Sequence, residues 1–136
     1  PFLYRTHLVI NGTRIVDGGV ADPIPAEEAF RQGARRIVVI RSRPVTYRKD
    51  PWLENRLAAF ATRDCPGLSQ AIFHQPQAYS RCVDFLQHPP NATQVIQIAP
   101  PVQLKTGRTT QQRDALLTDY ALGKALANAF IKDFKP

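Results

Sequence analysis

One acidic residue lies in a stretch whose composition suits an active site. Asp17 is followed by Gly18 and Gly19 and then by the proline-fixed run Pro23-Ile24-Pro25. Glycine has no Cβ and readily adopts positive φ, so two glycines leave the surroundings of the acid free of side chains. A carboxylate placed in this way can reach a substrate, and Asp17 is therefore the first candidate catalytic residue.

The segment before Asp17 predicts how this acid is positioned. Two apolar β-type runs, Leu8-Val9-Ile10 and Ile15-Val16, flank Asn11-Gly12, and Asn-Gly between such runs is the strongest short-range signal for a β-hairpin. Asp17 then follows the end of a strand. In open α/β sheets, ligands collect at the carboxyl ends of strands.

A longer stretch, from Gly12 to Arg41, resembles the patatin-like phospholipases. The matching residues are the Asp17-Gly18-Gly19 motif, Pro23-Ile24-Pro25, Ala29, Gly33-Ala34 and Ile37-Val38-Val39-Ile40. The resemblance implies an α/β fold, the C-terminal portion of a three-layer architecture with a mostly parallel sheet. The rest of the chain looks like a C-terminal extension of that family, so we expect a catalytic part at 1–43 and a mainly helical extension at 44–136, with one short strand near 93–98.

The resemblance also implies the chemistry. Patatin-like enzymes hydrolyse acyl esters of lipids with a Ser-Asp dyad and need no cofactor. Asp17 matches the dyad aspartate, and Gly18 and Gly19 match the glycines that form the backbone of the same motif. That aspartate would act as general base for a serine in a Gly-x-Ser-x-Gly motif. The serine and the oxyanion loop precede the aspartate in the family and are not in this sequence. We therefore expect the C-terminal part of a longer hydrolase, inactive alone, whose partners are a lipid or ester substrate and the N-terminal part.

Local patterns predict the remaining elements. Pro25 is suited to the first position of a helix at 26–32, which Gly33 would end, and the β-branched run Ile37–Ile40 is typical of a strand buried on both faces of a parallel sheet. Val95, Ile96 and Ile98 predict another short strand. Helical spacing of apolar residues recurs after Pro44, with a break at Pro66-Gly67 and a kink or end at Pro76. This first series comprises Trp52, Leu53, Leu57, Phe60, Leu68, Ile72, Tyr79, Val83 and Leu86.

A last helix follows, capped by Thr109 or Thr110. Its expected buried stripe contains Leu116, Leu117, Tyr120, Leu122, Leu126, Phe130 and Ile131.

Other polar residues are better explained by structural roles. Asp22 precedes proline, and an aspartate there commonly starts a turn. The three histidines, His7, His74 and His88, raise the alternative of a Ser-Asp-His triad, in which the histidine follows the acid in the chain. His74 and His88 fall in or at the end of helical segments, so surface or capping roles explain them better. Ser69, in Gly67-Leu68-Ser69, lacks the second glycine of a nucleophile elbow and a preceding strand, so we expect it near a helix N-terminus.

The charge distribution supports an alternative function. The net charge is +7, and basic residues follow one another without an acid between Glu28 and Asp50. Arg41, Arg43, Arg48 and Lys49 are candidates for contacts to anionic headgroups, so the alternative is a non-catalytic basic module that binds anionic membranes or acidic partners. A solvated face is the simplest explanation, and the absence of an RNA-binding motif argues against nucleic acid.

The two cysteines, Cys65 and Cys82, lack the spacing of a metal site and are expected to be free, buried thiols of a reducing compartment. Together with the absence of a long apolar run, they predict a cytoplasmic protein, with peripheral membrane contact as an extension of that prediction.

Overall fold

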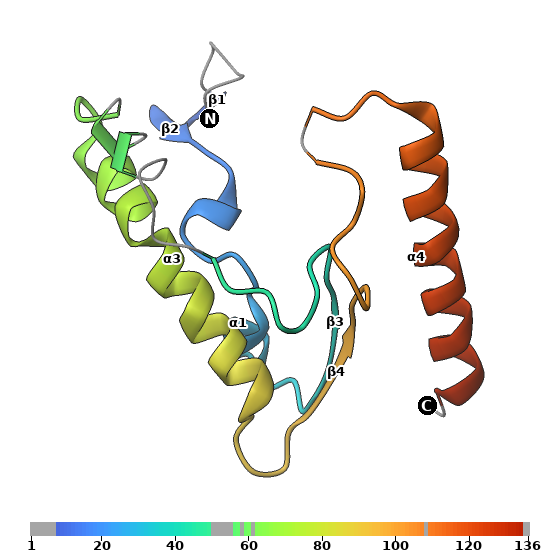
Figure 1. Cartoon of the computed structure of the whole chain (residues 1–136). Coiled ribbons are helices and arrows are strands. Elements are labelled where there is room, and N and C mark those ends of the chain that lie inside the picture. The colour runs from blue at the N-terminus through green and yellow to red at the C-terminus, as the bar shows by residue number, and fades with distance from the viewer. Residues whose placement is uncertain (1–7, 50–55, 58, 61, 108, 135–136) are drawn as a thin grey trace. The chain divides into compact units, whose positions relative to one another are not determined.

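The computed structural model describes residues 8–49, 56, 57, 59, 60, 62–107 and 109–134. The chain forms two interleaved units, one made of Pro1–Arg31 and Arg48–His88 and the other of Gln32–Tyr47 and Pro89–Pro136. Helices and a small parallel pair of strands give the chain an α/β character (Figure 1).

Unit 1 begins with the expected hairpin. Strand β1 (Leu8–Ile10) pairs antiparallel with β2 (Thr13–Ile15), and Asn11 and Gly12 between them have φ values of 50° and 76°. Two consecutive positive φ angles match the turn that best fits the right-handed twist of a hairpin, which explains the Asn-Gly pair. Among the described residues this pair is a sheet by itself, so β2 pairs only with β1 and does not extend a parallel sheet.

A short helical segment connects the hairpin to the first α-helix. The 3-10 turn η1 (Gly18–Val20) is followed by α1 (Ala26–Arg31), which begins at the predicted residue and ends one residue earlier than predicted. Pro25 lies just before the helix, where its carbonyl accepts a hydrogen bond from the Ala29 N–H at 3.1 Å. Gly33, with φ of 98°, follows the helix in the left-handed conformation that favours glycine.

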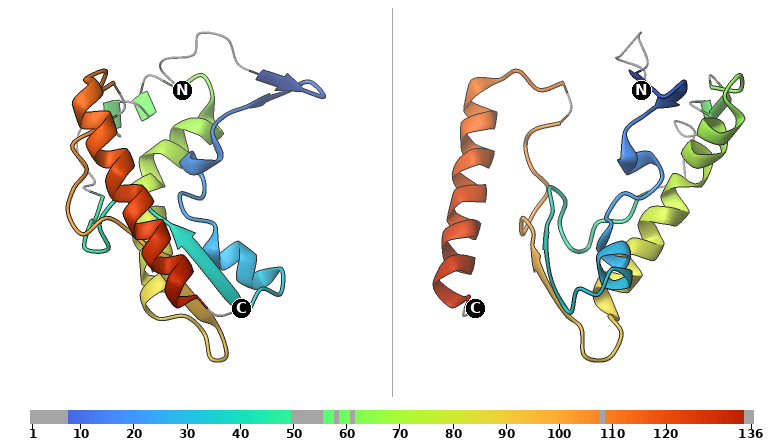
Figure 2. Two further views of the ribbon diagram at one scale, coloured as in Figure 1. Left: turned by 90° about the vertical axis from the view of Figure 1, so that its right-hand side faces the viewer. Right: turned by 180° about the vertical axis from the view of Figure 1, so that it is seen from behind.

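Helix α3 (Pro66–Gln87) is the longest described element of unit 1, and α1 lies alongside it (Figure 2). The ring centroids of Phe30 on α1 and Phe85 on α3 are 5.9 Å apart. The break expected at Pro66-Gly67 is the start of this helix, since Pro66 occupies its first turn. Pro76 was expected to kink or end a helical turn, but the helix continues past it. Proline has no backbone N–H, and burial of apolar side chains on one face of α3 compensates for the hydrogen bond that Pro76 cannot make. The buried residues of α3 are Ile72, Pro76, Ala78, Tyr79, Val83 and Leu86.

The helical prediction before α3 lies partly outside the described residues, including Trp52 and Leu53. Leu57 and Phe60 are helical but exposed, so the expected apolar stripe is not buried at these two positions. The Phe60 ring is instead covered by the Arg63 guanidinium, 4.9 Å from its centroid.

Unit 2 is built on the parallel pair of β3 (Arg36–Ile40) and β4 (Gln94–Ile98), in register from Arg36 opposite Gln94 to Ile40 opposite Ile98. Both strands were predicted. Burial of β3 on both faces was predicted for a sheet with further strands, and in the described pair one face is covered: Ile37 and Val39 are buried, whereas Val38 is 41% and Ile40 80% exposed. Successive side chains of a strand point to opposite faces of the sheet, and one face of this two-stranded sheet is covered, so Val38 and Ile40 point away from the covered face.

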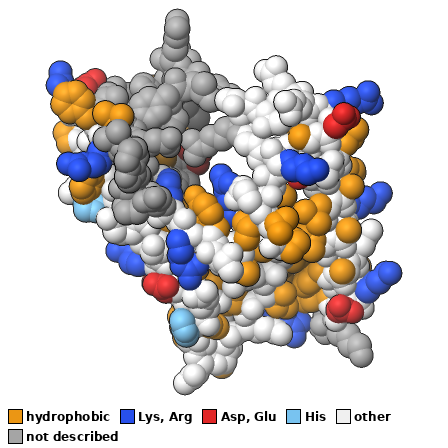
Figure 3. All heavy atoms as spheres, viewed as in Figure 1, with side chains coloured by type: hydrophobic (Ala, Val, Ile, Leu, Met, Phe, Trp, Pro, Cys, Tyr) orange, Lys and Arg blue, Asp and Glu red, His pale blue; other side chains and the backbone are white. Residues whose placement is uncertain are grey.

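Helix α4 (Arg113–Asp133) contacts β4 but departs from prediction at its start and on its surface. Its N-cap is Gln112, which makes no side-chain capping bond, so the predicted cap at Thr109 or Thr110 is wrong. The Thr110 Oγ1 instead accepts the Gly107 N–H at 2.8 Å in the preceding turn. The expected buried stripe is also wrong, since α4 has no buried residue. Hydrophobic side chains reach the surface over β4 and α4 (Figure 3), and the most exposed on the helix are Leu116, Leu117, Tyr120 and Ile131.

Candidate active site

Asp17 lies two residues after β2, where its own side chain caps the turn that follows. Its Oδ1 accepts the Gly19 N–H at 2.9 Å, and the carboxylate remains exposed. A Cβ added at Gly19 would come within 3.3 Å of this oxygen, tighter than an ordinary contact. Glycine at position 19 therefore suits the close pairing of the acid with its own backbone.

A pocket of about 530 Å³ opens beside Asp17 within unit 1. Two segments form it: the turn from Val16 to Ala21 and the residues from Asp64 to Ala71 that lead into and begin α3. This volume falls in the usual range for small-molecule sites, which are mostly apolar with a few polar groups. The lining residues are Val16, Asp17, Gly18, Val20, Ala21, Asp64, Cys65, Pro66, Gly67, Leu68 and Ala71.

The Asp17 turn is fixed to α3 at the back of this pocket. Val20 is buried in a cluster with Ala59 and Ile72, and Leu68 and Ala71 pack against that cluster. Gln75 adds a polar contact, because its Nε2 donates to the Gly19 carbonyl at 2.8 Å. The Gln75 Oε1 in turn accepts from the Lys49 Nζ. The wall that carries Asp17 is thus held in place by packing and hydrogen bonds.

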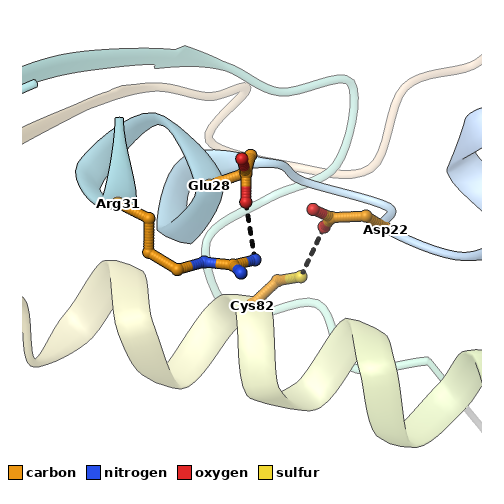
Figure 4. Close-up of polar contacts among 4 residues, drawn as sticks. All are labelled: Asp22, Glu28, Arg31 and Cys82. Carbon is orange, nitrogen blue, oxygen red and sulfur yellow. Dashed lines mark hydrogen bonds and ion pairs between the residues drawn. The ribbon is translucent and has the colours of Figure 1, made fainter. Parts of the chain in front are cut away.

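Asp22 has a structural role, although its partner was not predicted. Figure 4 shows the Cys82 thiol on α3 donating to the Asp22 Oδ1 at 3.4 Å, next to the Glu28–Arg31 ion pair of 2.6 Å on α1. Burial raises the pKa of the Cys82 thiol, and the charge and hydrogen bond of Asp22 act in the same direction. This contact connects the segment after Asp17 to the C-terminal half of α3.

Neither Ser69 nor the described histidines line the pocket. Ser69 lies in the first turn of α3, as expected, and its Oγ donates to the Ala59 carbonyl at 2.7 Å. His74 is inside α3 against the Phe73 ring, His88 is the C-cap of that helix, and His7 is outside the described residues. Within the described part of the chain, the pocket therefore offers Asp17 without a serine or histidine beside it.

The four basic candidates belong to different units. In unit 2, Arg41 is only 8% exposed and its Nη1 donates to the Gln97 Oε1 at 2.8 Å, which argues against a headgroup contact at Arg41. The Arg43 guanidinium lies 5.0 Å from the centroid of the Tyr47 ring. In unit 1, Arg48 donates to Gln87 at 3.2 Å, and Lys49 donates to Gln75.

The described helices contain no segment with the length and hydropathy of a membrane span.

Sequence reasoning missed one wall of the pocket. The sequence patterns at 64–71 indicate a helix break and an imperfect nucleophile elbow, and no local pattern connects this segment with Asp17. Burial of Val20 together with Ile72 brings the two segments together, and this contact depends on the tertiary fold.

Comparison with known proteins places the second wall in a recognised domain. A family model described as a domain of unknown function, DUF6363, matches residues 65–136, more than half of the chain. The uncharacterized protein YjjU of Escherichia coli (strain K12) is 30% identical over 132 residues, which cover 96% of this chain and 37% of that relative. The chain thus spans well under half of the length of this curated relative. No solved structure matches the chain.

Proposed function

The chain belongs to the DUF6363 family, and we propose that it is the C-terminal part of a patatin-like serine lipid acyl hydrolase, with a three-layer fold completed by other sequence. Asp17 would be the aspartate of the Ser-Asp dyad. The observation that carries the proposal is the position of the Asp17 carboxylate: exposed, hydrogen-bonded to the Gly19 N–H and on the wall of a mostly apolar pocket.

The proposed reaction assigns the acid one task. Asp17 takes the proton from the serine hydroxyl as the oxygen attacks an ester carbonyl, and this proton then passes to the leaving alkoxide. The serine and the oxyanion donors come from sequence outside these residues. The relative YjjU, of which this chain covers 37%, has additional sequence in which such a segment would lie.

The test uses the full-length protein that contains this chain. Asp17→Asn should lower kcat for a p-nitrophenyl acyl ester by roughly 100- to 10,000-fold, because the amide cannot take the serine proton. Asp22→Asn is the matched control: it makes the same change five residues away, outside the pocket lining, and should leave kcat near the wild-type value. Equal activity of wild type and Asp17→Asn would refute the dyad, as would turnover by the 136-residue chain alone.

A basic module that binds anionic membranes or acidic partners is the alternative function. The net charge of +7 favours it, although Arg41 is buried. Sedimentation with anionic vesicles distinguishes the two functions. Salt-sensitive binding by a full-length protein that does not hydrolyse lipid esters would favour the basic module.

A further inference from the structure

We infer that the pocket beside Asp17 holds the acyl chain of the substrate, and that Leu68 and Ala71 of α3 limit the chain length that fits. This inference rests on the proposed function, because it assumes that the bond to be cleaved lies next to Asp17. The first turns of α3, which begin the DUF6363 segment, would then take part in substrate selection.

The chemistry of the lining favours an uncharged aliphatic group. Most of the lining side chains are apolar, and the carboxylates among them belong to Asp17 and Asp64. No lysine or arginine is among the described residues that line it. Two carboxylates disfavour a phosphate or another anion, whereas the apolar surface gains free energy when a hydrocarbon chain displaces water from it.

The arrangement of the two walls gives the acyl group a direction. Asp17 is on the wall formed by the turn after β2, whereas Leu68 and Ala71 belong to the wall formed by α3. An ester carbonyl beside the acid therefore has a hydrocarbon surface available along the helix. Leu68 and Ala71 are suited to limit length because both are partly buried against Val20 and Ile72 and so cannot easily move aside.

Cys65 provides a probe of occupancy that does not depend on catalysis. Cys65 is partly buried and lines the pocket, whereas Cys82, also partly buried, lies outside it and contacts Asp22. The full-length protein is treated with N-ethylmaleimide in the presence of a glycerol monoalkyl ether, a neutral lipid analogue without an ester to cleave. A long-chain ether should slow modification of Cys65 severalfold and leave Cys82 unchanged, whereas a short-chain ether should protect neither. Equal modification of Cys65 with and without the long-chain ether would overturn the inference.

Side-chain volume provides the second test. In the full-length protein, Leu68→Trp should lower the ratio of kcat/KM for long-chain to short-chain p-nitrophenyl esters by about 10-fold or more, because the larger ring shortens the pocket. Leu68→Ala should raise this ratio. Gln70→Trp adds the same ring at an exposed position of α3 outside the pocket lining and should leave the ratio unchanged.

The two assays separate failure of this inference from failure of the proposed function. A protein that loses turnover in Asp17→Asn but keeps its chain-length ratio in both Leu68 variants retains the proposed function and overturns the inference. A protein without esterase activity in which the long-chain ether protects Cys65, and in which Leu68→Trp abolishes this protection, refutes the hydrolase but supports an aliphatic ligand in the pocket.

Discussion

At the scale of single residues, two aspartates five positions apart have different surroundings. Asp17 is exposed on the pocket wall, whereas Asp22 accepts a hydrogen bond from the thiol of Cys82, sixty residues away in the sequence. The Asp-Pro pair predicted a structural role for Asp22, but no sequence pattern could name its partner. A contact over that separation depends on how α3 packs, and local sequence does not encode it.

The thiol of Cys82 should titrate above the pH range of an exposed cysteine, because burial raises its pKa. Its stabilising contribution is present below the unfolded-state pKa and is lost as the pH rises through the folded-state pKa. Iodoacetamide labelling of Cys82, followed by mass spectrometry as a function of pH, should give a midpoint above that of the protein unfolded in urea. The Asp22→Asn variant, which removes the neighbouring charge, should lower this midpoint. Coincident midpoints in folded and unfolded protein would contradict the prediction.

At the scale of elements, those with strong local signals could be predicted from the sequence. The Asn11-Gly12 turn, the run Ile37–Ile40 and the strand around Ile96 each have such a signal, and the structure contains all three elements. The start of α4 could not be predicted in the same way. The carboxylate of Asp119 accepts hydrogen bonds from the backbone and hydroxyl of Thr106, and this side-chain hydrogen bond lowers the pKa of the Asp119 carboxyl. The loop before α4 is therefore fixed by a residue in the second turn of the helix.

Replacing two glycines of different backbone conformation by alanine should change the free energy of unfolding in opposite directions. Gly123 lies inside α4, and a Cβ added there meets no atom within 4 Å, so Gly123→Ala should stabilise the protein by about 0.5–1 kcal/mol through the lower entropy of its unfolded state. Gly33 has φ of 98°, so Gly33→Ala should destabilise it by about 1–2 kcal/mol. Urea denaturation of both variants measures the two changes. Changes of the same sign would contradict the argument.

At the scale of the whole molecule, the apolar surface of unit 2 should control association of the 136-residue chain. Ile40 is 80% exposed on β3, and Leu117 is exposed on α4. Exposed apolar surface of this kind favours self-association, so Ile40→Lys with Leu117→Lys should lower the average mass measured by light scattering and reduce binding of a hydrophobic dye. Gln112→Lys adds charge at an exposed, already polar position and should have little effect. Unchanged mass in the double variant would show that this surface does not drive association.

The order of segments in the two units has a consequence for synthesis on the ribosome. Arg36 of β3 is separated from its partner Gln94 of β4 by 58 residues, and the intervening chain includes α3 of the other unit. Closing so long a loop is slow compared with forming a helix or a hairpin. A nascent chain therefore exposes β3 unpaired until β4 has been translated, and this interval is when a chaperone or a neighbouring polypeptide would first meet it. A stop codon after residue 88 would make that unpaired state permanent.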